Sequence, residues 1–377
     1  MPYWRLSGFY AFYFMVVGAL VPYFGLYLQS LDFNAKQIGF IASILMLTKI
    51  IAPNIWGWLS ERSGKRLKLI RLGCLLAVIS FAAIFFNQSF LWLAWVITVF
   101  TFFWNAVLAQ FEVVTLDHLV EQPERYSQIR VWGSLGFVAV VVALGWVFDR
   151  IAITYLPHFI FVFTLLIWLS SLSVKEASHR EYAPSALGFG QILRKPAVYY
   201  FLIASFLLQL SHGPYYTFYS LYLESYDYSR TTIGLLWALG AVAEIAVFLV
   251  MHRLMPRLGV GPLFIWSLAL TVCRWMLIAL FPENVPLMVF AQVLHAFSFG
   301  TTHAVAMELV RQHFSGRHLG QGQAIYLSVG FGAGGAVGAV LAGQLWASSP
   351  SLTYTLAAVA AALALLAAWL GVRARSS

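Results

Sequence analysis

The sequence predicts an all-α membrane protein with twelve transmembrane helices. Of its 377 residues, 61% are hydrophobic and only 10% are charged, and the mean hydropathy is +0.81. A soluble chain carries about a quarter charged residues, whereas most charges here lie between long apolar runs. The first apolar segment lacks a small-residue cleavage site, so we expect a retained helix and not a signal peptide.

Charged residues and clusters of Pro, Gly and Asn divide the chain into twelve apolar segments. Each segment is long enough to cross about 30 Å of hydrocarbon as a helix. The predicted helices lie near residues 3–31, 37–60, 67–86, 90–117, 128–148, 153–173, 195–223, 230–253, 261–281, 286–309, 320–347 and 351–371.

Lys and Arg are distributed unevenly over the connecting segments. With a cytoplasmic N-terminus, the outer loops hold only Lys36, Arg150 and Arg230, and the inner segments hold nearly all the rest. This is the positive-inside pattern, so we expect both termini on the cytoplasmic side of the membrane. The net charge of +9 then follows from topology, and nucleic acid is not an expected partner.

An internal repeat relates the two halves of the chain. YLQSLDFNAKQIG (27–39) resembles YLESYDYSRTTIG (222–234), and Gly18 matches Gly213 at the same offset. Parallel six-helix repeats are a known transporter architecture, with binding near the bilayer midplane. We therefore expect two six-helix bundles, residues 1–173 and 193–377, joined by a cytoplasmic linker, residues 174–192.

Polar and ionisable residues inside the apolar segments are candidate functional residues, because hydrocarbon penalises them unless they are paired or hydrated. Glu112 and Arg130 have similar depths on two consecutive, antiparallel helices, so a salt bridge is expected. Both a structural role and a binding role are open for this pair. Glu244 and Arg274 can pair in the same way, and a buried carboxylate is a usual site for a coupling proton. Lys49 stands alone, and both snorkelling and pairing with an acid elsewhere are open for it.

Three histidines complete the intramembrane set. His212 precedes Gly213 and Pro214, which should loosen its helix and free backbone carbonyls next to a cavity. His295 and His303 are eight residues apart, so their faces should differ by about 80° at about 100° per residue. A direct function and an ordinary interhelical hydrogen bond are both open for each histidine. The aromatic neighbours of this set are suited either to stacking on a ligand or to packing; they are Trp104, Trp132, Tyr215, Tyr216 and Trp237.

The loop GWLSERSGKR (57–66) resembles the helix 2–3 signature of the major facilitator superfamily. Gly57 and Gly64 suit a tight turn, and the charged residues suit a switchable contact between helix ends at the inner face. An ordinary positive-inside loop is the alternative. The gating residues expected from the resemblance are Gly57, Glu61, Arg62, Gly64, Lys65 and Arg66.

NAVLAQFE, followed by Arg130 and WGSLG, resembles helices 4 and 5 of the lactose permease family. That resemblance implies substrate binding by Asn105, Glu112 and Arg130. Glu244, Arg274 and His295 also match an acid, an arginine and a histidine of that family. However, Ser298 and Gln292 stand where that family has an acid and a lysine, so the same proton coupling is not expected.

The phenylpropionic acid permease branch of the superfamily is similar over nearly the whole chain. The shared residues include LLQ-LS-H with YY-F (207–218), LW-LG-VAE (236–244) and His303. This resemblance implies a major facilitator fold and proton-driven uptake of an aromatic carboxylate. Together with the positions of the polar and aromatic residues, the resemblances give the expected substrate-binding residues Asn105, Glu112, Arg130, Trp132, His212, Tyr216, Arg274 and His295. The implied proton-coupling residues are Glu244, His295 and His303.

The sequence therefore predicts a proton symporter for a small organic anion. A sugar or nucleoside symporter and a drug/proton exporter are alternatives within transport, and a non-transporting receptor or a membrane-embedded enzyme is an alternative outside it. The sequence has no catalytic acid/base pair with a nucleophile and no metal-ligand spacing such as HExxH, so we expect no enzyme activity, metal or cofactor. The expected partners are a small-molecule substrate, protons and the lipid bilayer, and we expect a monomer.

Overall fold

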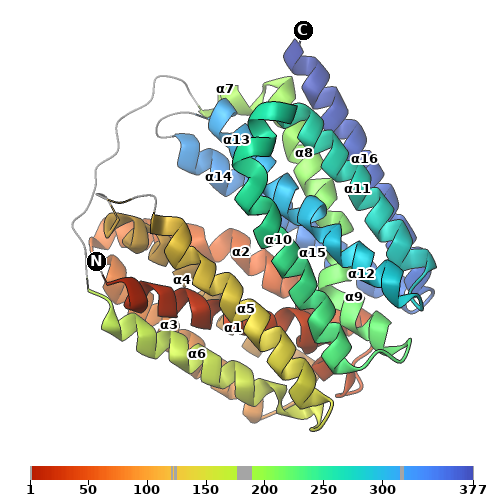
Figure 1. Cartoon of the computed structure of the whole chain (residues 1–377). Helices are drawn as coiled ribbons and strands as arrows, with labels where there is room; N and C mark the ends of the chain where they lie inside the picture. The colour runs from red at the N-terminus through yellow and green to blue at the C-terminus, as the bar shows by residue number, and fades with distance from the viewer. Residues whose placement is uncertain (1, 120–121, 123–124, 176–188, 315–317, 377) are drawn as a thin grey trace. The chain divides into compact units, whose positions relative to one another are not determined.

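The computed structural model describes residues 2–119, 122, 125–175, 189–314 and 318–376, and these residues contain helices but no strand (Figure 1). Within them, eleven helices are long and apolar enough to cross a membrane. The remaining predicted span, residues 195–223, is present as two shorter helices, α8 (Pro196–Ser211) and α9 (Gly213–Glu224), separated at His212. The prediction of an all-α membrane protein is thus confirmed.

The first of two compact units contains Met1–Arg180 together with Tyr228–Ala238. In it, α1 packs against α5 and α6, while α4 packs against α2 and α3. The helix ends lie within a few residues of the predicted ones. The helices are α1 (Tyr3–Gln29), α2 (Ala35–Ser63), α3 (Arg66–Ala82), α4 (Phe90–Asp117), α5 (Tyr126–Phe148) and α6 (Leu156–Ser173), with short 3₁₀ turns at Ala83–Phe85 and Ile153–Tyr155.

The second unit contains Glu181–Asp227 and Leu239–Ser377. In it, α16 packs against α8 and α11, and α9 packs against α15. The helix α10 begins among the residues of the first unit and continues into the second. Besides α8 and α9, the helices are α7 (Phe189–Leu193), α10 (Arg230–Leu258), α11 (Val260–Leu280), α12 (Val285–Val293), α13 (Thr302–His313), α14 (His318–Leu327), α15 (Gly335–Trp346) and α16 (Pro350–Ser376).

Two further predicted spans are interrupted by π-helical segments. π-Helical segments at Ala296–Thr301 and Ser328–Gly334 connect α12 to α13 and α14 to α15. Most of the predicted linker, residues 174–192, falls outside the described residues. The predicted bundle boundaries therefore stay a prediction.

The internal repeat has the same backbone conformation in both copies. Asp32 follows α1 with φ 61°, and Asp227 follows α9 with φ 62°. Asp is one of the few residues that adopt this left-handed conformation readily. The amide of Ser30 donates to Leu26 and that of Ser225 donates to Leu221, so the preceding hydrogen bonds also match. The similarity in the sequence thus corresponds to one repeated turn.

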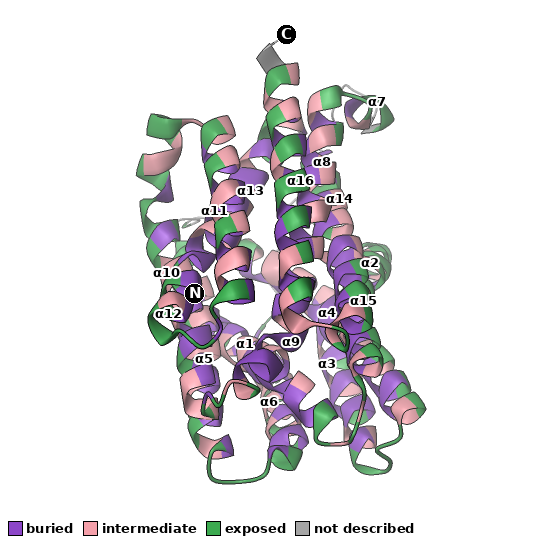
Figure 2. Ribbon diagram, turned by 90° about the vertical axis from the view of Figure 1, so that its right-hand side faces the viewer, coloured by how far each residue is buried: buried purple, intermediate pink, exposed green. Residues whose placement is uncertain are grey.

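The surface of α16 has the polarity expected next to lipid. Large apolar side chains are exposed at Leu352, Leu356, Val359, Leu363 and Leu366, which recur on one side of the helix. The buried side consists mainly of alanines, including Ala357, Ala361, Ala364 and Ala368. Figure 2 shows exposed positions along one side of α16. A soluble helix would bury the leucines instead.

The loop after α2 confirms one glycine of the predicted turn and corrects the other. Gly64 has φ 62° and ends α2, with its amide donating to Ser60. Gly57, in contrast, lies inside α2, because the helical segment continues to Ser63. The expectation that Gly57 forms part of the turn was therefore wrong. Glu61, Arg62 and Lys65 are exposed, and Arg66 lies 4.0 Å from Asp117 at the end of α4.

The first turn of α10 is held by a carboxylate from the end of α5. Asp149 accepts hydrogen bonds from the backbone amides of Arg230 and Thr231 and from the Thr231 hydroxyl. An acidic side chain in this position satisfies orphan amides and favours the positive end of the helix dipole. Burial alone would raise the pKa of Asp149, but these donated hydrogen bonds outweigh it and hold the pKa below its usual range.

Candidate functional site

Arg274 is the centre of a buried polar cluster in the second unit. It lies in the middle of α11 and is completely buried. Its guanidinium donates to the carbonyl of Ala291 at 2.9 Å, to Nδ1 of His295 at 2.9 Å, to Oγ of Ser298 at 2.9 Å and to Oε1 of Gln292 at 3.5 Å. The Tyr215 and Trp275 rings lie 4.2 and 4.6 Å from its central carbon. The charge is thus surrounded by acceptors and aromatic faces.

Glu244 on α10 is joined to Arg274 through His295. Nε2 of His295 lies 2.6 Å from Oε1 of Glu244. The sequence allowed a direct Glu244–Arg274 pair by analogy with Glu112 and Arg130, whereas the described contacts place His295 between them. The imidazole is long enough to connect the two charged groups, with one nitrogen facing each.

The hydrogen bonds determine where the ring proton of His295 lies. A guanidinium only donates, so Nδ1 of His295 must accept and carries no proton. A neutral imidazole then carries its hydrogen on Nε2 and donates it to Oε1 of Glu244. The cluster is a directional chain of donors from Arg274 to Glu244.

Two glycines let α10 approach closely enough for this contact. A Cβ atom on Gly240 would lie 3.2 Å from both Gln292 and His295, and one on Gly300 would lie 2.7 Å from Val247. Because Gly240, Glu244 and Val247 recur on one face of α10, close packing above and below Glu244 places its carboxylate against His295.

Glu112 and Arg130 form a looser pair in the first unit. Oε1 of Glu112 lies 4.0 Å from Nε of Arg130, and the two side chains are 35% and 31% exposed. The Arg130 guanidinium lies 4.1 Å from the Phe14 ring and 5.5 Å from the Tyr10 ring of α1. The structure therefore contains the ion pair predicted from the sequence, with part of each side chain accessible.

His212 and Tyr216 lie beside the Arg274 cluster. His212 is fully buried, and its Nδ1 contacts the Leu208 carbonyl at 2.8 Å. Its ring stacks on Tyr216 and meets Trp275 edge-on. The predicted loosening at Gly213–Pro214 is present as the interruption between α8 and α9, but the ring of His212 is enclosed by aromatic side chains.

The ring of Phe299 lies between His295 and His303 and stacks on both, with centroids 5.7 Å from His295 and 6.0 Å from His303. Residues four apart are also neighbours on an ordinary α-helix, so these contacts do not contradict the predicted separation of about 80°. The segment between the histidines is π-helical at Ala296–Thr301, with more residues per turn than the continuous α-helix that the prediction assumed. Nδ1 of His303 lies 3.2 Å from the hydroxyl of Tyr326.

Two predicted binding residues are engaged within the first unit. The Asn105 amide donates to the Thr48 hydroxyl at 2.9 Å and to the Leu45 carbonyl at 3.3 Å, which ties α4 to α2. The Trp132 indole donates to the hydroxyl of Tyr3 at 2.9 Å. Among the described contacts, neither side chain joins the Glu112–Arg130 pair.

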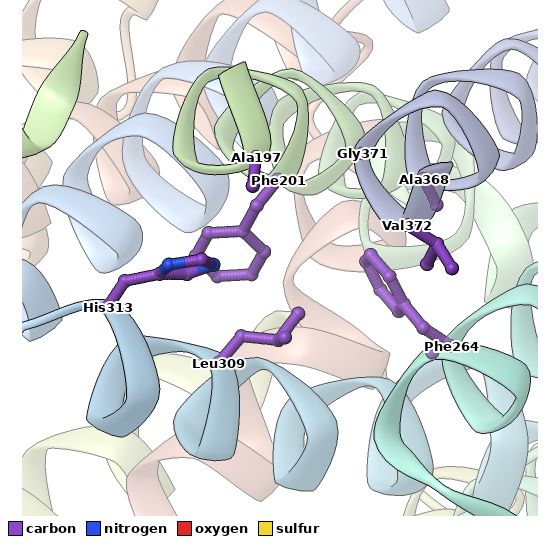
Figure 3. Close-up of a pocket in the computed structure, with 9 residues that line it drawn as sticks. Ala197, Phe201, Phe264, Leu309, His313, Ala368, Gly371 and Val372 are labelled. Atoms are coloured by element: carbon purple, nitrogen blue, oxygen red, sulfur yellow. The ribbon is translucent and has the colours of Figure 1, made fainter. Parts of the chain in front are cut away.

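A small pocket elsewhere in the second unit does not coincide with these polar residues. It lies between α8, α11, α13 and α16, and Figure 3 shows Phe201, Phe264, Leu309, Val372 and His313 around it. Its lining is almost entirely apolar and includes none of Glu244, Arg274 or His295. The chemistry of the chain therefore points to the buried cluster and not to this pocket.

Trp275, Gln292 and Ser298 of the Arg274 cluster were not predicted as functional, and Tyr215 was expected only as an aromatic neighbour. Tyr215 donates to Gln292 at 3.0 Å and covers the guanidinium, while the Trp275 indole donates to Ser211 at 3.1 Å. Gln292 and Ser298 were noticed only as departures from the lactose permease pattern. Their side-chain oxygens were the one feature of the sequence that could have identified both residues as neutral acceptors for Arg274.

Membrane-length helices in two repeated halves, with ion pairs at membrane depth, define a membrane transporter of the major facilitator fold. Residues 3–356 match the MFS_1 like family, and the chain belongs to that family. Its relatives are transporters and not enzymes.

Two relatives and one solved structure show the range of similar proteins. The chain is 25% identical to the probable 3-phenylpropionic acid transporter of Escherichia coli (strain K12), over 91% of this chain and 90% of that protein. It is 28% identical to the maltose permease of Geobacillus stearothermophilus, over 86% and 83%. The crystal structure of the nucleoside transporter NupG matches with a TM-score of 0.83 at 15% identity, covering 100% of both chains. This last similarity establishes the fold.

Proposed function

We propose that the chain is a proton-coupled symporter that imports an aromatic carboxylate, such as phenylpropanoate, by alternating access. The observation that carries this proposal is the hydrogen-bonded chain from Arg274 through His295 to Glu244. The substrate class is supported by the E. coli relative, whose name refers to 3-phenylpropionic acid.

Glu244 is the proposed proton-binding group. While Arg274 donates to Nδ1 of His295, that ring cannot take a second proton without losing the bond. Ser298 and Gln292 present neutral oxygens to Arg274. Among the described members of the cluster, Glu244 is the one carboxylate, so an added proton binds there.

Protonation of Glu244 links the proton to the substrate through charge. The ionised carboxylate offsets the charge of Arg274, whereas the protonated group leaves the cluster with a net positive charge that attracts an anion. Protonation also weakens the contact with His295 and loosens α10 against the π-helical segment. A proton that binds first and leaves last would therefore favour cotransport with an anion.

The other candidate residues receive supporting roles in this proposal. Glu112, Arg130 and Tyr216 remain proposed substrate contacts. Asn105, Trp132, His212 and Arg274 shape the site through the internal contacts described above. His295 transmits the protonation state of Glu244 to Arg274, and His303 tunes the same segment through Tyr326.

The test is concentrative uptake of radiolabelled 3-phenylpropionate into proteoliposomes under an imposed pH gradient. The wild type should accumulate the probe above equilibrium. Glu244→Gln should only equilibrate it, while still exchanging labelled for unlabelled probe, because substrate binding remains and proton binding is lost. Glu283→Gln, at an exposed carboxylate between α11 and α12, is the matched control and should retain pH-dependent accumulation. Unchanged accumulation and pH dependence in Glu244→Gln would show that the proton binds elsewhere.

A sugar or nucleoside symporter is the second candidate, supported by the maltose permease relative. The accessible Glu112–Arg130 pair supplies the acceptors and donors that a neutral polyol requires. Competition against 3-phenylpropionate uptake by benzoate, maltose and uridine separates the candidates. Stronger competition by maltose or uridine than by benzoate would favour the second candidate, and net export of the probe would favour an exporter.

The proposal includes a bacterial inner membrane location, cytoplasmic termini and a monomeric transporter. The Arg66–Asp117 contact and the exposed charges Glu61, Arg62 and Lys65 form the proposed inner gate, together with the turn at Gly64. A reporter fused to the C-terminus that is active only in the cytoplasm would test the topology.

A further inference from the structure

Lys49 lies too deep in α2 for its charge to reach water at a membrane surface. It is midway between Ala35 and Ser63, the two ends of the helix. At about 1.5 Å per residue, each end is about 20 Å away. A lysine side chain cannot extend that far, so snorkelling does not explain this residue.

The side chain also points away from the exposed apolar stripe of its helix. That stripe consists of Leu47, Ile51, Ile55 and Trp58, which are 45–58% exposed. Lys49 is two residues from Leu47, which places it about 200° around the helix. It therefore lies on the side of α2 opposite the surface suited to lipid.

The described residues provide almost no compensation for this charge. The ammonium has N–H donors and no acceptor function, and its described hydrogen bond is to Sδ of Met46 at 3.6 Å. A thioether is a weak acceptor. An ammonium at this depth with neither a carboxylate nor a carbonyl partner is costly, and such residues mark substrate or ion pathways.

The other two cations at membrane depth are already engaged. Arg274 donates to the Ala291 carbonyl, His295, Ser298 and Gln292. Arg130 lies beside Glu112 and against the Phe14 ring. A carboxylate arriving at Arg274 would have to displace good hydrogen bonds, whereas at Lys49 it would displace a thioether contact.

A second unsatisfied donor lies at the same level on α4. Thr48, next to Lys49, contacts the hydroxyl of Thr101 at 3.0 Å and accepts from Asn105. Trp104, between these two α4 residues, is 5% exposed and stacks on Tyr13 of α1 with ring centroids 4.8 Å apart, and its indole Nε1 has no acceptor among the described residues. An ammonium on α2 and an indole N–H on α4 at one level are donors suited to a carboxylate, which accepts through two oxygens.

We propose that Lys49 binds the carboxylate of the transported substrate and makes the protein selective for an organic anion over its neutral analogue. This rests on the proposed function for the substrate class. It assigns the direct contact with the carboxylate to Lys49 on α2, whereas the Arg274 cluster attracts the anion through its net charge without contacting it.

The test compares the binding of 3-phenylpropionate with that of its neutral amide, 3-phenylpropanamide, to purified full-length protein. The wild type should prefer the acid. Lys49→Gln and Lys49→Met should lower the ratio of acid to amide affinity by about thirtyfold or more, because one member of a buried charge pair is removed. Lys49→Arg should retain much of the preference, since it keeps the charge.

Lys36→Gln, at the exposed start of α2, and Met46→Leu, which removes the thioether, are the controls and should leave the ratio unchanged. A ligand-free measurement gives a second readout: Lys49→Met should raise the unfolding temperature, because it removes an uncompensated charge. A lower unfolding temperature would reveal a structural role and overturn the proposal.

Two binding outcomes also overturn it, and they can be distinguished. If the wild type prefers the acid and Lys49→Gln keeps that preference, only the assignment of Lys49 fails. If the wild type binds acid and amide equally, or binds neither, the anionic substrate class fails with it. Proton coupling through Glu244 is measured separately, by accumulation under a pH gradient.

Discussion

The two intramembrane acid–arginine groups differ in how tightly they are built. Glu112 and Arg130 are separated by 4.0 Å, and about a third of each side chain is exposed. Glu244 and His295 are separated by 2.6 Å, and Arg274 behind them is fully buried. An accessible pair can exchange partners at low cost, whereas a buried chain of donors has no substitute for any member. The Glu112–Arg130 pair is therefore suited to contacting a solute, and the Glu244–His295–Arg274 group is suited to binding a proton.

The largest expected difference between the two groups follows from removing each arginine. Arg274→Gln leaves His295, Ser298 and the Ala291 carbonyl without their donor and Glu244 without a counter-charge. We expect a loss of about 3–5 kcal/mol of stability, against about 1 kcal/mol or less for Arg130→Gln. Thermal unfolding of the purified variants measures both. Equal losses would mean that the two groups are equally structural.

A smaller effect is expected when one acceptor is removed from the buried group. Ser298→Ala deletes a hydrogen bond from a charged donor, and we expect a loss of about 1.5–3 kcal/mol. Ser170→Ala is the matched control, because the Ser170 hydroxyl bonds only to the Ile167 carbonyl of its own helix among the described contacts. Thermal unfolding of both variants tests this difference. A Ser298→Ala variant as stable as the control would show that the Arg274 cluster tolerates a missing acceptor.

The smallest expected effect comes from Asp149, an exposed carboxylate outside the membrane-spanning segments. Its pKa is lowered in the folded state, so its contribution is complete above the unfolded value of about 3.9 and is lost as pH falls through the folded pKa. Asp149→Asn should cost about 0.5–1 kcal/mol near pH 7, because the helix start loses a charged acceptor. This difference from the wild type should shrink as pH falls below about 4.

Unfolding temperatures of the wild type and Asp149→Asn across this pH range are the measurement. A difference that grew on acidification would have the wrong sign for a carboxylate with a lowered pKa. Asp149 differs in this respect from the buried Arg274 cluster, because bulk water does not reach Arg274.

Helix positions were predictable from the sequence because apolar run length is a strong signal in a membrane protein. The internal repeat was also predictable from the sequence. The left-handed backbone conformation shared by Asp32 and Asp227 explains why both copies have Asp at this position. The pairing of Glu112 with Arg130 followed from depth alone, since consecutive antiparallel helices leave few choices.

The partners of Glu244 were not predictable in the same way. Depth suggested Arg274, but the choice of His295 depends on how closely α10 approaches and how the following segment is wound. Both are set by backbone features, the glycines at 240 and 300 and the π-helical segment. The amino-acid composition predicts neither the close approach of α10 nor the π-helical winding. From the sequence, Ser298 and Gln292 were interpreted only as neutral residues at positions where the lactose permease family has charged ones. Their role as hydrogen-bond acceptors depends on the position of the Arg274 guanidinium, which the sequence does not give.

The π-helical segment between His295 and His303 also makes residue number a determinant of this site. A π-helical turn holds about one residue more than an α-helical turn, so deleting one residue there would restore ordinary α-helical winding and leave His295 and His303 seven residues apart. At about 100° per residue, that spacing places the two histidines within about 20° of each other around the helix. The side chains between them, Phe299 among them, would change neighbours, although no side chain of the cluster had been substituted. The segment thus determines which side chains lie between the two histidines, and the number of its residues matters as well as their identity.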